Sequence, residues 1–400
     1  MKTFSNKSKT PPTKLKGNII TPYRIINGGE INFKDGVITY AGERKRDDDI
    51  FDCHNFGEDY ISPGFVDLHV HGGGGHDFMD GTEEAVVGVA SLHASHGTTS
   101  LLATTLTCPD EELFNLFDVY RRVSENGDKT CLRGIHLEGP YFSAAQKGAQ
   151  DERYIRNPEK SHYEKILTAG SGIIKRWSAA PELPGAAELG RRLTELGILP
   201  SAGHSDAVYD EMLEALENGY THLTHFYSGM STITRKGGFR RPGLIESGYM
   251  LGQTTVEIIA DGCHLPPPLM RLVYTSKGPH MTALVTDALR GAGTDSCEMI
   301  LGSKENGVTA IIEDGVAKLK DRTAFAGSVA TSDSLVRNMM CLAGATLTDA
   351  VTMMTATPAR IGGIKNKGLL RVGFDADIAV FDRDITVKAV FIEGERVFQT

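Results

Sequence analysis

The segment FVDLHVHGGGGHDF, residues 65–78, brings two histidines together immediately before four glycines. His69 and His71 are two residues apart, so on a strand both imidazoles would point to the same face. A histidine pair on one face can bind a metal ion, and glycines let the backbone approach that ion or a ligand closely. A sharp turn followed by a flexible loop explains the same residues equally well.

Ionisable side chains also end other predicted strands in the middle of the chain. Taken singly, such a histidine is more often structural than a ligand, and such an aspartate often caps the next helix. Taken together, seven residues end six predicted strands, which exceeds chance placement in loops. Three or more nitrogen and oxygen ligands with an open position are typical of a catalytic metal site. Besides His69 and His71, these residues are Glu138, His204, His225, His264 and Asp287; His136 shares a face with Glu138 and could be a ligand by geometry.

Strands and helices alternate through residues 63–364, the part of the chain that carries these side chains. Thr98–Thr104 is a predicted strand, and Thr82 followed by two acids predicts the start of the helix before it. Gly203–Asp206 is expected to close a strand and to cap a helix that continues to residue 217. This alternation favours an α/β fold, a TIM-like (β/α)8 barrel with its chemistry at the carboxyl ends of the strands.

The two chain ends are rich in short predicted strands. Asp35-Gly36 lies between alternating apolar runs and predicts a hairpin. Neither end alone has enough strand to bury a face, so residues 1–62 and 365–400 are expected to pair into one small β-sandwich domain. A hairpin insertion with an Asp-Gly turn is expected at Val308–Leu319. The lysine-rich first sixteen residues are expected to form a loose arm.

The composition is that of a globular protein and narrows the classes of function. Hydrophobic residues make up 40% and charged residues 23% of the 400 residues. A net charge of -9 and a pI of about 5.8 disfavour a nucleic-acid-binding surface. No apolar run approaches the roughly 18 residues of a membrane span, and the first residues lack the apolar core of a secretory signal. Six scattered cysteines suggest reduced, mostly buried thiols and therefore a cytoplasmic protein.

Taken together, the motifs resemble those of the amidohydrolase superfamily and, within it, the N-acetylglucosamine-6-phosphate deacetylase family. The resemblance covers roughly residues 60–382, with the motifs in the same order. It implies the barrel fold, a divalent metal cofactor, and hydrolysis of an N-acetylhexosamine 6-phosphate, with N-acetylglucosamine 6-phosphate as the expected substrate. The motifs are PGFVDLHVHG from Pro63, HLEGPY from His136, KGAQ from Lys147, GHSD from Gly203, TH from Thr224, ADGCH from Ala260 and VTDA from Val285.

The resemblance also implies roles for the strand-end residues. Glu138, His204 and His225 would hold the metal ion that is common to the family. His69 and His71 would bind a second ion that some members keep, and Glu138 could then bridge both. One or two ions per subunit are therefore expected, and histidine and carboxylate ligands suit Zn²⁺, Fe²⁺, Mn²⁺ or Co²⁺.

The expected chemistry follows from the resistance of an amide carbonyl to attack by water. A bound metal ion lowers the pKa of its water from about 15.7 to near 7 and makes hydroxide available at neutral pH. Asp287 would act as general acid/base, taking the water's proton and passing it to the departing amine. His264 would contact the sugar or polarise the scissile carbonyl.

Further positions match the substrate contacts of the family, with departures in this chain. Gln150 stands where the family usually has histidine, and His225-Phe-Tyr-Ser-Gly replaces His-x-x-Asn-Ala. Arg240 and its arginine neighbour could clamp a phosphate or form a solvated basic loop. In relatives an arginine of this loop reaches across a dimer interface, so a homodimer is implied. The substrate positions are Ala149, Gln150, Ser228, Gly229, Arg240, His264, Phe325, Ala326 and Gly327.

Two other functions fit parts of the same pattern. Another amidohydrolase, acting on unphosphorylated N-acetyl amino sugars or on N-acyl amino acids, would use the same metal site. A barrel that binds amino sugars without turnover would be stabilised by the sugar but would release no acetate. The presence of Glu138, His204, His225 and Asp287 together argues against the non-catalytic alternative.

Overall fold

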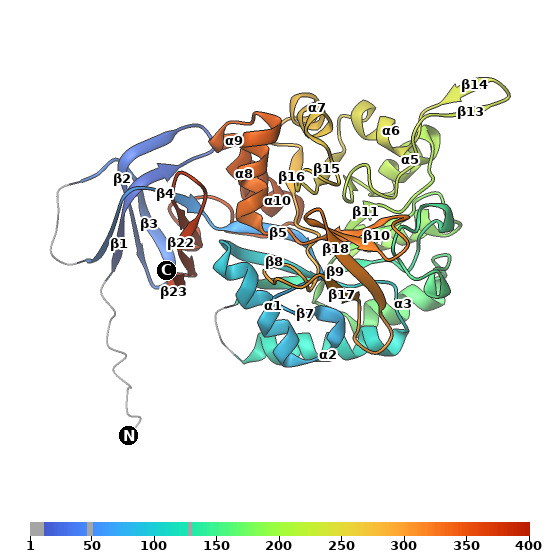
Figure 1. The fold of residues 1–400 in the computed structure, drawn as a ribbon, viewed down its shortest axis with the longest axis horizontal. Helices are drawn as coiled ribbons and strands as arrows, with labels where there is room; N and C mark the ends of the chain where they lie inside the picture. Colours follow the sequence, from blue (N-terminus) through green and yellow to red (C-terminus); the bar gives the residue numbers. More distant parts are fainter. Residues whose placement is uncertain (1–11, 46–50, 127–129) are drawn as a thin grey trace.

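The computed structural model describes residues 12–45, 51–126 and 130–400 (Figure 1). Its centre is an eight-stranded parallel sheet whose strands follow one another in chain order. The sheet closes into a ring, because the Asp287 amide donates to the His69 carbonyl at 2.9 Å and Val70 bridges to Ala288. The predicted (β/α)8 barrel is thereby confirmed. Its strands are β5 (Phe65–Val70), β8 (Thr98–Thr104), β9 (Leu132–Glu138), β10 (Ile174–Ala179), β11 (Leu199–Ala202), β12 (His222–Leu223), β15 (Thr255–Ile258) and β16 (Thr282–Leu284).

Helices connect the barrel strands and pack apolar faces against them. The first begins where the sequence predicts, because the Thr82 hydroxyl accepts a hydrogen bond from the Ala85 amide at 3.2 Å. Within the described residues, no helix has the length and hydrophobicity needed to cross a membrane. The helices are α1 (Glu83–Ser95), α2 (Asp110–Glu125), α3 (Lys160–Ala169), α4 (Ala186–Glu195), α5 (Tyr209–Glu217), α6 (Leu244–Met250), α7 (Pro267–Lys277), α8 (Ser332–Ala343), α9 (Leu347–Met354) and α10 (Ala356–Ile361).

The helix expected to be capped by Gly203–Asp206 begins later, at Tyr209, so that expectation is wrong. Glu182 accepts hydrogen bonds from the Ser205 hydroxyl at 2.7 Å and from the Asp206 amide at 2.6 Å. These contacts hold the residues after His204 in a loop instead of a first helical turn.

Both chain ends contribute to a second, seven-stranded sheet, as the sequence predicts. The two ends meet where β21 pairs antiparallel with β4. The sheet folds over on itself, since the rings of Phe33 and Phe391 lie 5.8 Å apart although three strands separate theirs in sheet order. The domain boundaries at residues 62 and 365 stay predictions. The strands are β1 (Thr13–Ile20), β2 (Ile25–Lys34), β3 (Val37–Gly42), β4 (Asp52–Pro63), β21 (Ile378–Phe381), β22 (Val387–Ile392) and β23 (Glu395–Gln399).

The loose N-terminal arm is wrong for residues 13–16, which lie in β1. Lys14 is buried, and its ammonium nitrogen lies 3.5 Å from a carboxylate oxygen of Glu30. A lysine taken as a sign of solvation is therefore paired inside the sheet. Residues 1–11, the rest of the expected arm, lie outside the described residues.

An insertion of four antiparallel strands precedes α8 and lies over the barrel mouth. The predicted hairpin is confirmed: its Asp314 and Gly315 have φ of 57° and 78°, a left-handed pair that suits a tight hairpin turn. Ser328 bridges to Ala288 at the end of the barrel, which brings the last strand to the mouth. The strands are β17 (Glu298–Leu301), β18 (Val308–Glu313), β19 (Val316–Leu319) and β20 (Phe325–Ser328).

The expectation of mostly buried cysteines is wrong. All six thiols are free, but only Cys131 is buried, and Cys53, Cys297 and Cys341 are exposed. A thiol is small, so whether it is buried or exposed depends on the polarity of its neighbours in the chain. Cys297, for example, follows an Asp-Ser pair.

Candidate metal centre

The strand-end residues converge at one mouth of the barrel. His69 lies on β5 with His71 just beyond it, and Glu138 is the last residue of β9. His204 and His225 follow β11 and β12. Strands far apart in the sequence thus place buried imidazoles around one carboxylate.

These side chains form two groups that could each hold a metal ion: His69, His71 and Glu138, and Glu138, His204 and His225. The Glu138 carboxylate oxygens lie 3.3 Å and 3.4 Å from the Nε2 atoms of His69 and His71. In the second group the corresponding distances to His204 and His225 are 3.4 Å and 3.1 Å. Two atoms bound tetrahedrally to one ion at about 2.1 Å lie about 3.4 Å apart, so the spacing suits metal ligands.

The charges in this cluster also favour a cation. Burial alone would lower the pKa of His69, but the carboxylates of Glu138 and Asp287 raise it to about 10. Burial likewise opposes ionisation of Glu138, yet the surrounding histidines hold the pKa of that carboxyl well below its usual value. The site therefore attracts positive charge, which a divalent ion would supply in place of protons.

The backbone is strained at three of these residues. His204, His225 and Asp287 have φ of 47°, 27° and 47°, in the left-handed region that residues with side chains seldom adopt. Such strain persists only where the surrounding structure holds it and is concentrated at functional sites. This left-handed conformation turns all three side chains from the strand ends into the barrel mouth.

Asp287 lies beside the first group of ligands. Its Oδ1 is 3.1 Å from the Nε2 atom of His71 and 3.4 Å from that of His69. Although burial opposes ionisation, these histidines lower the pKa of Asp287, so the carboxylate is ready to accept a proton. Its position fits the predicted general acid/base.

Glu257 on β15 supports both groups and was missed by the sequence analysis. Its carboxylate accepts hydrogen bonds from His69 Nδ1 at 2.9 Å and from the His225 amide at 3.0 Å. It also pairs with Arg176 at 2.5 Å, and both side chains are fully buried. A glutamate inside the apolar strand segment Val256–Ile259 was the available signal, because a buried charge needs a partner.

His136 is not part of either group. Its Nε2 atom lies 2.7 Å from the Ser178 hydroxyl, and its Nδ1 atom lies 3.3 Å from the Thr104 hydroxyl. Both ring nitrogens are therefore occupied within the barrel interior. Its possible role as a ligand, which rested on strand periodicity alone, is not supported.

The first two of the four glycines after His71 serve packing. A Cβ on Gly72 would lie 2.4 Å from the His76 carbonyl oxygen, and one on Gly73 would lie 2.4 Å from the Leu92 side chain of α1. These two glycines allow close contact with α1 and neighbouring backbone, whereas Gly74 and Gly75, with φ of 62° and 86°, take the left-handed conformation in the turn that follows. A close approach to a metal or ligand stays a prediction.

A pocket of about 240 Å³ opens above the cluster. Arg240 is the one predicted substrate position that does not line it. That residue is exposed on β14 (Phe239–Arg241), which pairs with β13 (Thr234–Lys236) in a hairpin projecting from the barrel (Figure 1). The pocket brings together the others: Ala149, Gln150, Ser228, Gly229, His264, Phe325, Ala326 and Gly327.

Two polar residues of the pocket are fixed by neighbours. The ring of His264 is held by a 2.7 Å contact between its Nδ1 atom and Asp261, which leaves Nε2 for a substrate. Gln150 donates from its amide to Glu138 at 2.7 Å, and its oxygen accepts from the Thr107 amide at 2.9 Å. Gln150 therefore contacts a proposed ligand directly, beyond its expected substrate role.

Comparisons with known proteins agree with this geometry. Residues 60–397 match the model of the amidohydrolase family. An N-acetylglucosamine-6-phosphate deacetylase from Lysinibacillus sphaericus is 32% identical, covering 93% of this chain and 94% of that protein. An N-acetylgalactosamine-6-phosphate deacetylase from Escherichia coli O157:H7 is 30% identical, covering 84% and 87%. The structure of the N-acetyl-D-glucosamine-6-phosphate deacetylase from Mycobacterium smegmatis, solved with N-acetyl-D-glucosamine-6-phosphate, has a TM-score of 0.90 at 30% identity and covers 98% of this chain and 100% of that one.

Proposed function

Because the chain belongs to the amidohydrolase family and, within it, to the N-acetylglucosamine-6-phosphate deacetylases, we propose that it hydrolyses the acetamide of an N-acetylhexosamine 6-phosphate. The products are acetate and the amino sugar phosphate. One observation carries the proposal: two groups of metal-type ligands share Glu138 at the floor of a pocket, with Asp287 3.1 Å from His71.

We propose that Glu138, His204 and His225 would hold one divalent ion and that Glu138, His69 and His71 would hold a second. When bound, such ions lower the pKa of a water and draw electron density from the acyl carbonyl. Histidine and carboxylate ligands suit Zn²⁺, Fe²⁺, Mn²⁺ or Co²⁺.

Asp287 moves the proton in this proposal. Its carboxylate takes a proton from the attacking water, whose oxygen bonds to the acyl carbon. It then delivers that proton to the nitrogen as the carbon–nitrogen bond breaks, because an amide nitrogen leaves poorly unless protonated. His264, whose Nδ1 donates to Asp261, would accept a hydrogen bond from the sugar through Nε2.

The sugar would occupy the polar side of the pocket, near Ser228 and Gly229. Arg240 is exposed on its projecting hairpin, so it would meet a phosphate in the pocket of a second subunit. We therefore propose a homodimer in which the β13–β14 hairpin completes the partner's phosphate site. Three exposed free thiols fit a reducing compartment, so we also propose the cytoplasm.

The glucosamine substrate has one close competitor. The Escherichia coli relative is named for the galactosamine epimer and is 30% identical, near the 32% of the glucosamine relative. A panel of both epimers, each with and without the 6-phosphate, together with N-acetyl amino acids, separates these substrates by their kcat/KM.

Acetate release from N-acetylglucosamine 6-phosphate tests the proposal. We expect turnover by metal-loaded protein, and a loss of 10²–10⁴-fold in kcat for Asp287→Asn, the usual contribution of a general acid/base. Asp295→Asn, in the exposed loop before β17, is the control and should retain full activity. No release by metal-loaded protein, or an undiminished rate in Asp287→Asn, would refute the proposal.

A further inference from the structure

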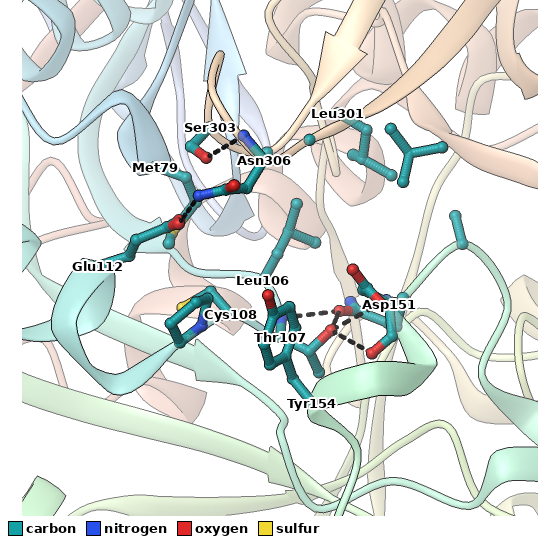
Figure 2. Close-up of a pocket in the computed structure, with 16 residues that line it drawn as sticks. Met79, Leu106, Thr107, Cys108, Glu112, Asp151, Tyr154, Leu301, Ser303 and Asn306 are labelled. Atoms are coloured by element: carbon teal, nitrogen blue, oxygen red, sulfur yellow. Dashed lines mark hydrogen bonds between the residues drawn. The ribbon is translucent and has the colours of Figure 1, made fainter.

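A second, smaller cavity of about 40 Å³ adjoins the active-site pocket beside the loop between β8 and α2 (Figure 2). Leu106, Ala149, Gln150 and Leu301 line both spaces. These residues form the wall that the catalytic pocket and the cavity behind it share. None of the residues that would hold metal lines the smaller cavity.

The shared wall has a rigid part and a yielding part. Gln150 is held by Thr107 on one side and by Glu138 on the other. Leu106 and Leu301 have no polar contact to fix them and are held by packing alone. The leucines are therefore the part of the wall that can move when a larger group presses on it.

The position of this wall suits the acyl part of a substrate. Leu106 follows β8, the second strand of the ring, whereas Ser228 and Gly229 follow β12, the sixth. Strands two and six face each other across an eight-stranded barrel. A polar sugar phosphate on the serine side directs the apolar end of its acyl group across the ligands toward the leucines.

We propose that Leu106, Leu301 and the cavity behind them form an acyl subsite that accepts straight N-acyl groups longer than acetyl, namely propanoyl and butanoyl. The proposal rests on the proposed function and extends its substrate class. The reaction is the same: the water oxygen bonds to the acyl carbon, the carbon–nitrogen bond breaks, and the nitrogen takes the proton. Propanoate or butanoate leaves in place of acetate.

The size of the cavity sets an upper limit on chain length. Its volume of about 40 Å³ is small beside the 240 Å³ of the active-site pocket, so it suits a short extension of the acyl chain and not a long one. Towards α2 the cavity meets an exposed hydrogen bond, in which the Asn306 amide donates to Glu112 at 2.5 Å and joins the insertion to α2 (Figure 2). A hexanoyl chain would have to pass this polar, exposed pair.

The test compares kcat/KM for the N-acetyl, N-propanoyl, N-butanoyl and N-hexanoyl derivatives of glucosamine 6-phosphate. We expect propanoyl and butanoyl to fall within roughly tenfold of acetyl, and hexanoyl to fall at least tenfold further, since one misfitted methylene costs about 10–200-fold. Leu106→Ala should raise the ratio of propanoyl to acetyl.

Filling the cavity from behind provides the sharper comparison. Cys108 lines the cavity but not the active-site pocket. Cys108→Leu should lower the propanoyl-to-acetyl ratio about tenfold or more and leave acetate release unchanged, whereas the size-matched Cys108→Ser should not alter the ratio. Val308→Phe fills the same space from the exposed start of β18 and replaces Cys108→Leu if that variant does not fold.

The outcomes separate this subsite from the deacetylase activity itself. The subsite would be overturned if the protein released acetate but its kcat/KM for the propanoyl sugar were more than 200-fold lower and Leu106→Ala did not change that ratio. The proposed function would then still stand. An unchanged ratio in both filling variants would also overturn it. If none of the acyl sugars is hydrolysed, the proposed function fails and the subsite fails with it.

Discussion

The role of His69 and His71 in metal binding can be tested independently of the other proposed ligands, because Glu138, His204 and His225 form a complete group without them. We expect the double variant His69→Asn/His71→Asn to bind one divalent ion per subunit where the parent protein binds two. Elemental analysis of protein purified without chelators measures the difference. His280→Asn, at an exposed position, should retain both ions. A double variant that keeps its full metal content would contradict the assignment of the pair.

Glu257 orients the imidazole of His69 and balances the charge of Arg176. Substitution by glutamine removes the charge that faces His69 and leaves the buried Arg176 without its counterion. We expect Glu257→Gln to weaken metal binding at the His69 group about 10–100-fold, the usual effect of losing a partner of a metal ligand. The metal-free protein should be destabilised by about 3–5 kcal/mol.

Metal titration calorimetry and thermal unfolding of the metal-free protein measure the two effects of Glu257→Gln separately. Glu217→Gln, on the exposed side of α5, is the matched control and should change neither. A Glu257→Gln protein with normal metal affinity but a lowered melting temperature would show that Glu257 only supports the fold.

The contrast between Glu257 and the strand-end residues shows what the sequence could predict at this scale. Strand periodicity and the barrel rule place Glu138 and His204 at the mouth without knowledge of their neighbours. The partners of Glu257 lie on β5, on β10 and just after β12, and they meet only because the ring closes. A single sequence contains no signal for that closure beyond the buried charge itself.

At the scale of elements, α1 packs on the glycines that follow His71. His93 of α1 is fully buried and contacts the Gly72 carbonyl through Nε2 at 3.0 Å. Burial lowers the pKa of His93 to about 4, against about 6.5 in an unfolded chain. As the pH falls from 6.5 to 4, the unfolded chain takes up a proton that the folded chain does not, so stability is lost in this window.

We expect His93→Gln to reduce the loss of stability between pH 7.5 and pH 4.5 by about 2.5 kcal/mol, because the titration is removed while an amide can still donate to Gly72. Urea unfolding at both pH values, with chelator present so that metal release does not contribute, measures this difference. His280→Gln, at an exposed position, should not alter it. Equal losses in His93→Gln and the parent would contradict a neutral buried His93.

The elements themselves were predicted to different degrees. Asp-Gly turns fix their hairpins through the backbone of two residues, and the turns at 35–36 and 314–315 were predicted correctly. The start of α5 was not, because the contacts that delay it come from Glu182, more than twenty residues earlier in the chain. Local signals predict an element well only when nothing distant competes for its first turn.

At the scale of the whole molecule, the proposed dimer makes each active site depend on two chains. Asp287 would act in its own subunit, whereas the exposed Arg240 would act in the partner's. Arg240→Ala should raise KM for the phosphorylated substrate and leave turnover of the unphosphorylated sugar unchanged. Lys320→Ala, an exposed cation on the insertion, should change neither value.

Mixing Asp287→Asn and Arg240→Ala, both impaired at low concentrations of the phosphorylated substrate, tests the shared site directly. An Asp287→Asn chain still supplies Arg240, and an Arg240→Ala chain still supplies Asp287, so a mixed dimer contains one complete site. After unfolding and refolding an equal mixture with metal, half of the dimers are mixed, and activity at low substrate should recover to about a quarter of the parent value. Each variant refolded alone is the control. Recovery no greater than the average of the two variants would show that Arg240 does not serve the partner's pocket, and a monomeric mass in light scattering would exclude the shared site altogether.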